Sequence, residues 1–202
     1  MNDLFLCNGK PLSLIVLSGG GSRRMQWDKA LLPAPEGTII EHIIKQLENL
    51  FDEVLISVSD REKFDFLKRR LVVDDKPGEG PMMGIKTTLQ ASKNEKSFII
   101  ACDIPDIDLG FLQGLIQKSE HSDITLPISP EGRKEPLFAV YSKSVFPEME
   151  KLLDEGVLSL LPLFERCKVQ YVPMEENIWF KNLNTRKDYE DFLEQINRPQ
   201  PE

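Results

Sequence analysis

Hydrophobic positions along the chain fall into two alternating patterns. Short runs rich in Val, Ile and Leu, bounded by turn residues, predict buried strands. They lie at 12–17, 53–58, 71–73, 97–101, 124–128, 137–141 and 169–172. Between these runs, apolar residues recur at helical spacing. Helices are predicted at 38–50, after Asp60, at 80–91, after Asp108, after Ser144, at 158–166 and at 185–196.

Several of these helices carry sequence signals at their first turn. Thr38 followed by Glu41 has the spacing of a capping box, in which each side chain caps the other's backbone N–H. Thr185 followed by Asp188 has the same spacing. Pro81 stands at the first position of the third predicted helix, where proline is tolerated.

The alternation of strands and helices predicts βαβ units with right-handed crossovers. The expected fold is α/β: a three-layer α/β/α architecture with a mostly parallel, Rossmann-like sheet. The run 97–101 is the most continuously apolar, as expected of a central strand covered on both faces. No repeat or low-complexity linker divides residues 1–202, so one domain is expected. In such sheets ligands bind beyond the carboxyl ends of the strands, so the candidate loops follow residues 17, 58, 73, 101 and 128.

The composition argues against some classes of function. The formal net charge of -8 argues against a protein that grips nucleic acid through a basic face. The longest apolar runs are far too short to span a bilayer, and no signal-peptide pattern opens the chain, so no membrane partner is expected. The three cysteines (Cys7, Cys102 and Cys167) lack metal-ligand spacing and suggest a reducing compartment. The expected location is the cytoplasm.

The loop after the first predicted strand combines glycines with basic residues: Gly19, Gly20, Gly21, Arg23, Arg24 and Lys29. Residues without Cβ atoms let backbone N–H groups approach a polyanion, and the basic side chains can bond phosphate oxygens. The alternative is a flexible turn with solvated basic residues. The loop is neither a P-loop nor a dinucleotide fingerprint, because neither spacing is present. Phosphate binding is the favoured interpretation.

Three further segments carry candidate polar side chains. Asp74 and Asp75 follow the third strand and precede the start of a helix, where a carboxylate could accept hydrogen bonds from a base or ribose. Asp103 follows the central strand, and a carboxylate at that rim is a candidate Mg²⁺ ligand. Asn182 and Asn184 are two residues apart, so alternation places both amides on one side. Each segment could instead be a simple turn or helix cap.

The segment 17–32 resembles the signature loop of the molybdenum cofactor guanylyltransferases, which belong to the nucleotide-diphospho-sugar-transferase-like nucleotidyltransferases. The resemblance continues in order through nearly the whole chain, at 80–84, 102–105, 135–141 and 182–185. It implies Mg²⁺-dependent transfer of GMP from GTP to the terminal phosphate of molybdopterin, with release of pyrophosphate. The resemblance is also compatible with contacts to other cofactor-assembly proteins and molybdoenzyme acceptors.

The resemblance further implies roles for individual residues. The nucleotide would be lined by Leu17, Ser18 and Gly19, and its phosphates would be held by Gly20, Gly21 and Arg24. Lys29 would neutralise charge on the α-phosphate and the leaving pyrophosphate. Asp75 or its neighbour Asp74 would contact the nucleoside, and Asp103 would hold Mg²⁺. Asn182 and Asn184 would face the pterin phosphate or the metal.

The sequence departs from the family pattern at three places. Gln26 replaces a usual glycine, Met82 and Met83 replace Leu-Ala, and Ser57 stands where an asparagine often contacts the nucleotide. Three alternatives remain open: a cytidylyltransferase or other nucleotidyltransferase of the same fold, a nicotinamide-dependent oxidoreductase, and a non-catalytic GTP-binding adaptor. The first is disfavoured by Ser18-Gly19, because cytidine-using relatives tend to carry Ala-Ala there, and the second by the missing dinucleotide fingerprint.

Overall fold

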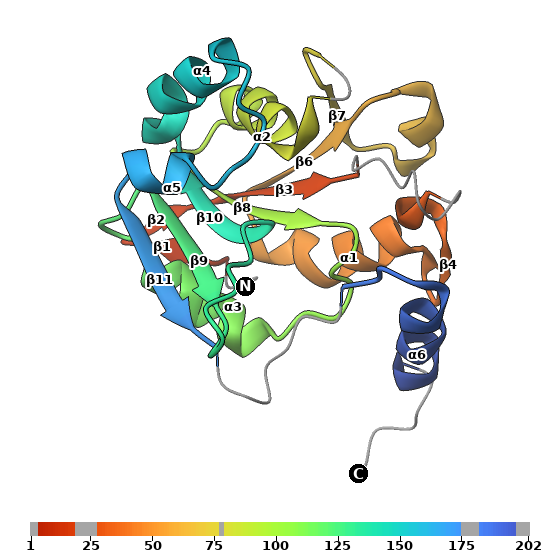
Figure 1. The fold of residues 1–202 in the computed structure, drawn as a ribbon. Helices are drawn as coiled ribbons and strands as arrows, with labels where there is room; N and C mark the ends of the chain where they lie inside the picture. The colour runs from red at the N-terminus through yellow and green to blue at the C-terminus, as the bar shows by residue number, and fades with distance from the viewer. Residues whose placement is uncertain (1–3, 19–27, 77–78, 175–181, 197–202) are drawn as a thin grey trace.

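The computed structural model describes residues 4–18, 28–76, 79–174 and 182–196. Within these residues a central seven-stranded sheet is flanked by helices on both faces (Figure 1). Its strands are β3 (Ser13–Leu17), β6 (Glu53–Val58), β7 (Arg70–Val73), β8 (Lys96–Ala101), β9 (Ile124–Ile128), β10 (Phe138–Ser142) and β11 (Val169–Pro173). Two small hairpins pair β1 (Leu6–Cys7) with β2 (Lys10–Pro11) and β4 (Pro33–Ala34) with β5 (Gly37–Thr38).

The helices follow the predicted order. The α-helices are α1 (Ile39–Leu47), α2 (Gly80–Ala91), α3 (Leu109–Gln117), α4 (Phe146–Asp154), α5 (Leu163–Arg166) and α6 (Arg186–Ile196). Short 3-10 turns occur at η1 (Lys29–Leu31), η2 (Glu48–Leu50), η3 (Glu62–Leu67) and η4 (Lys143–Val145). The capping box of α1 is present as predicted, with Thr38 and Glu41 each accepting a backbone N–H of the other.

The sheet order is β11-β9-β10-β8-β3-β6-β7, which puts the apolar strand β8 in the middle as predicted. All neighbouring strands run parallel except β10, which is antiparallel to both β8 and β9. The mostly parallel α/β fold is therefore confirmed. The carboxyl ends of the parallel strands share one edge of the sheet, and the start of β10 lies at that same edge.

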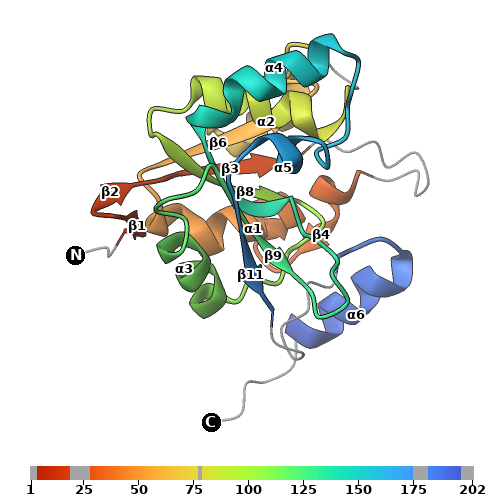
Figure 2. The same ribbon diagram turned by 60° about the vertical axis from the view of Figure 1, so that its left-hand side comes forward.

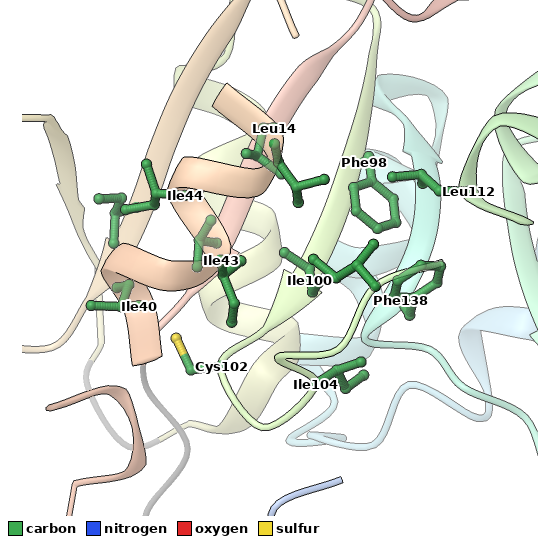
Figure 3. Packing of buried hydrophobic residues seen from close by; sticks show 14 of the residues in the cluster. Leu14, Ile40, Ile43, Ile44, Phe98, Ile100, Cys102, Ile104, Leu112 and Phe138 are labelled. Carbon is green, nitrogen blue, oxygen red and sulfur yellow. The ribbon is translucent and has the colours of Figure 1, made fainter. Parts of the chain in front are cut away.

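Two hydrophobic layers hold the helices against the sheet. Along β8, Phe98 and Ile100 face α1 and α3, whereas Ile99 faces α2, α4 and α5. Figure 2 shows the two helical layers on opposite sides of the sheet. The first layer is seen in Figure 3, where Phe98 lies between the sheet and Leu112. Alternate side chains of a strand point to opposite faces, so both layers can be fully buried.

Two predicted helix boundaries were wrong. The helix expected at 158–166 is reduced to α5, which begins at Leu163. Pro162 has no N–H to donate to the Leu158 carbonyl oxygen four residues earlier, so a regular helix over 158–166 would lose that hydrogen bond. The helix expected to open at Ser144 begins instead at Phe146, because Ser144 lies within a 3-10 turn that Ser142 caps.

Candidate active site

The ends of β3 and β6 are joined by polar contacts at the carboxyl edge of the sheet. The backbone N–H of Ser18 donates to the carbonyl oxygen of Ser57 at 3.1 Å, and the Ser18 hydroxyl donates to the same oxygen at 2.6 Å. The backbone N–H of Cys102 donates to the carbonyl oxygen of Leu17 at 3.2 Å. Leu17 and Ser18, two predicted nucleotide-lining residues, are therefore fixed between the two neighbouring strand ends.

Lys29 brings together three segments that are far apart in the sequence. It opens η1, whose first turn is capped by the Asp28 carboxylate. The Lys29 Nζ lies 3.3 Å from the Asn184 Oδ1 and 3.6 Å from the Asp103 Oδ2. The side chains of Lys29 and Asp103 are only 18% and 27% exposed. A cation, a carboxylate and an amide thus meet at the carboxyl edge of the sheet.

Asp103 is also held through its backbone. Its carbonyl oxygen accepts the N–H of Leu183 at 2.8 Å, so the 182–184 segment docks directly on the end of β8. Asp188 stabilises this segment because its Oδ2 accepts the N–H groups of Asn184 and Thr185 at 2.9 and 2.7 Å. The predicted capping box at the start of α6 is confirmed in this form.

Helix α6 is anchored to the rest of the chain by contacts on both sides. The Tyr189 hydroxyl donates to the carbonyl oxygen of Pro33 at 2.8 Å, and the Gln195 amide donates to the Asp106 Oδ2 at 2.7 Å. The Phe192 ring meets the His42 ring edge-on, with 5.6 Å between centroids. These contacts explain how residues near the end of the chain reach a site built largely from its first half.

The structure separates the two neighbouring carboxylates after β7. Asp74 is partly buried and accepts the Ser57 hydroxyl at 2.7 Å, whereas Asp75 is exposed. Burial raises the pKa of Asp74, and the Ser57 hydrogen bond opposes this shift. A Cβ atom on Gly84 would lie 2.7 Å from the Ser57 Oγ, so the glycine lets α2 approach this pair closely. Ser57, which departs from the family pattern, here orients Asp74.

Asp74→Asn should stabilise the protein at pH 7 relative to the wild type. An aspartate whose pKa is raised by folding contributes stability below its unfolded-state pKa of about 4 and loses it as the pH rises through the folded-state pKa. Asparagine keeps the Ser57 hydrogen bond without the charge. Urea unfolding of both proteins between pH 4 and 8 measures the difference, which should shrink as the pH falls. The matched control is Asp75→Asn, and an equal gain in that variant would contradict the assignment to burial of Asp74.

Glu135 is a site residue to which the sequence analysis gave no role. The residue is 9% exposed, and its Oε2 accepts a hydrogen bond from the Asn182 Nδ2 at 3.4 Å. Burial raises the pKa of Glu135, the Asn182 hydrogen bond lowers it, and the nearby negative charge of Asp103 raises it further. The signal that could have found it is the short segment 129–137. That segment is too short for a crossover of a dozen or more residues, so it returns the chain antiparallel, to the edge where Asp103 lies.

Several predicted phosphate-binding residues lie outside the residues that the structure describes: Gly19, Gly20, Gly21 and Arg24. Their roles stay predictions. In the described part of the chain, no group of three or more His, Cys, Asp or Glu side chains is arranged to hold a metal ion. Mg²⁺ needs only one or two carboxylates when substrate phosphates supply further oxygens. Among the residues that the structure describes, no helix is long and apolar enough to cross a membrane.

Comparison with known proteins gives a consistent result. Residues 14–168 match the model of the MobA-like NTP transferase domain. The probable molybdenum cofactor guanylyltransferase of Carboxydothermus hydrogenoformans is 35% identical over 189 residues, covering 90% of this chain and 95% of the relative.

Solved structures agree with this match. Molybdopterin-guanine dinucleotide biosynthesis protein A from Archaeoglobus fulgidus superimposes with a TM-score of 0.78 at 25% identity, covering 92% of this chain and 98% of that one. A 4-diphosphocytidyl-2C-methyl-D-erythritolsynthase from Anaerococcus prevotii has a TM-score of 0.69 at 16% identity, covering 95% and 98%, and supports the fold alone. The chain therefore belongs to the MobA-like NTP transferase family.

Proposed function

We propose that this protein transfers the GMP group of GTP to the terminal phosphate of molybdopterin and forms molybdopterin guanine dinucleotide. A phosphate oxygen of molybdopterin attacks the α-phosphorus of GTP, the bond to the bridging oxygen breaks, and pyrophosphate leaves. The single observation that carries the proposal is the meeting of Lys29, Asp103 and Asn184 at the carboxyl edge of a sheet of this family. The names of the relatives supply the choice of substrates.

The proposed chemistry suits the side chains present. The attacking phosphate is already an anion, so no general base is required, and the reaction depends on positioning and charge stabilisation. Lys29 supplies a positive charge for the phosphate oxygens. Ser18 and Leu17 line the nucleotide with Gly19, and Asp74 or Asp75 contacts the nucleoside. The position of Asn184 beside Lys29 suits a contact with the incoming pterin phosphate.

The residues at the site fit a divalent cation, which we propose to be Mg²⁺. Asp103 offers a carboxylate, and the Asn182 Oδ1 is a buried oxygen with no hydrogen-bond partner among the described residues. Both are the oxygen ligands that this ion prefers. When bound, the cation would neutralise phosphate charge beside Lys29. The cytoplasm, the single domain over 1–202, and contacts with cofactor-assembly proteins and molybdoenzyme acceptors stay predictions.

Pyrophosphate release tests the proposal directly. With Mg²⁺ and molybdopterin present, we expect kcat/KM for GTP to exceed those for CTP and ATP about 10²-fold or more, because a wrong base leaves buried polar groups unpaired. The same assay without molybdopterin is the control. Equal turnover of CTP would favour a cytidylyltransferase, and GTP binding without pyrophosphate release would favour an adaptor.

A further inference from the structure

Glu135 lies at the edge of the sheet where β8 ends and β10 begins. In the antiparallel pairing of β10 with β8, Phe138 lies opposite Ile100. The pairing continues by one residue on each chain, because the Ala101 N–H donates to the Leu137 carbonyl oxygen at 2.9 Å. Asp103 lies two residues beyond Ala101 and Glu135 two residues before Leu137, so both carboxylates lie at this edge of the sheet. The Glu135 N–H is also engaged, with the Pro127 carbonyl oxygen at 3.1 Å. Glu135 is thus fixed between the ends of β8 and β9.

The hydrogen bond from Asn182 to Glu135 determines which end of the Asn182 amide remains available. The Asn182 Nδ2 donates to the Glu135 Oε2 at 3.4 Å, and an amide has only one other polar end, its acceptor oxygen. Glu135 therefore selects the Nδ2 end, and the Oδ1 end is left over. That oxygen is buried and unpaired within the described part of the chain. A buried acceptor without a donor is costly, and a bound cation would satisfy it.

The position of Asn182 suits an oxygen that binds the same cation as the Asp103 carboxylate. Leu183, the next residue, donates its backbone N–H to the Asp103 carbonyl oxygen. Asn184, one residue further, contacts the Lys29 ammonium, which also lies near the Asp103 carboxylate. A direct contact of Glu135 with substrate phosphate is disfavoured, because two like charges would then meet in a buried place.

On the basis of the proposed nucleotidyl transfer, we propose that Glu135 is a positioning residue for the metal site. It fixes the Asn182 amide so that the Oδ1 serves with the Asp103 carboxylate as an oxygen ligand of the divalent cation. Residues that orient metal ligands in this way influence affinity without touching the ion, and their loss costs 10–100-fold in affinity or activity.

The test uses Mn²⁺ as a paramagnetic probe with the full chain and GTP, without molybdopterin. Water-proton relaxation reports Mn²⁺ immobilised on the protein. Glu135→Ala should raise the Kd for Mn²⁺ about 10–100-fold. Glu135→Gln should give an intermediate Kd, because glutamine can present either an acceptor or a donor to Asn182. A role in packing alone predicts a wild-type Kd for the glutamine variant, since its shape is unchanged, and that result would overturn the proposal.

Two controls distinguish the orientation of Asn182 by Glu135 from the general effect of losing a charge. Glu131→Ala removes a charge from the same loop, where the carboxylate accepts the Ser129 hydroxyl at 2.7 Å, and should leave the Kd unchanged. In an Asn182→Ala background, Glu135→Ala should add little to the Kd, because both changes remove the same ligand. Full additivity of the two changes in the Kd for Mn²⁺ would overturn the proposal. It would also be overturned if Glu135→Ala lowered the thermal stability and left the Kd unchanged. Absence of pyrophosphate release by the wild type would instead contradict the proposed function and leave the Mn²⁺ comparison intact.

Discussion

Lys29→Ala should lower kcat about 10²–10³-fold, by analogy with the loss of one preorganised donor to a developing negative charge. The Lys29 ammonium lies 3.3 Å from the Asn184 Oδ1 and 3.6 Å from the Asp103 Oδ2, so its position is set before substrate binds. Because the charge it faces grows as pyrophosphate leaves, kcat should fall more than KM changes. Steady-state pyrophosphate release at several GTP concentrations measures both quantities.

The controls for Lys29→Ala are the loss of an exposed lysine elsewhere and a replacement that keeps the positive charge. Lys45→Ala removes a lysine that is 67% exposed and 3.9 Å from Glu36, and should leave kcat unchanged. Lys29→Arg should restore only part of the rate, because a planar guanidinium does not replace a compact ammonium. Far-UV circular dichroism should show the same helix content in each variant. Wild-type pyrophosphate release by Lys29→Ala would show that this lysine is a structural partner of Asp103 only.

Asp103→Asn should abolish Mg²⁺-dependent transfer, because asparagine keeps the size of the side chain but not its charge. Charge stabilisation by a bound metal contributes several kcal/mol to a transition state, which corresponds to a loss of about 10³-fold or more. GTP affinity should fall much less, since the nucleotide is proposed to be held mainly by the loop after β3 and by contacts to its base. Titration of Mg²⁺ against activity, with GTP binding measured in parallel, tests both parts.

Asp106→Asn is the matched control for Asp103. Asp106 is exposed, lies three residues further along the same loop and contacts Gln195, a bond that asparagine can keep. This variant should retain wild-type activity and an unshifted Mg²⁺ midpoint. The reverse outcome, with Asp103→Asn normal and Asp106→Asn inactive, would move the metal site to Asp106.

The elements predicted from hydrophobic patterning are largely those observed, and the exceptions have local causes. β6, β9 and α2 have the predicted bounds. The antiparallel direction of β10 was not predicted, although the short 129–137 connection indicates it. The helix at 158–166 was overestimated, because Leu158 and Leu161 fit a helical pattern but are 41% and 57% exposed.

The candidate site was predictable in its residue types but not in its pairings. Patterning placed Leu17 at the end of a strand and Asp74 and Asp103 after strands, and parallel strands bring their carboxyl ends to one edge. This rule does not predict which carboxylate contacts which partner. The bond between Ser57 and Asp74 depends on the close approach of α2 at Gly84, and that packing involves three separate segments.

The α/β class and the central place of β8 could be predicted from the sequence alone, as could the edge of the sheet that carries the candidate site and the resemblance to a family. These follow from local periodicity and from residues that are close in the chain. The contacts of Lys29 with Asp103 and Asn184, and the contact of Asn182 with Glu135, arise from the tertiary packing. Such contacts join residues up to 155 positions apart, and they depend on strand direction, register and the docking of α6, which no local pattern encodes.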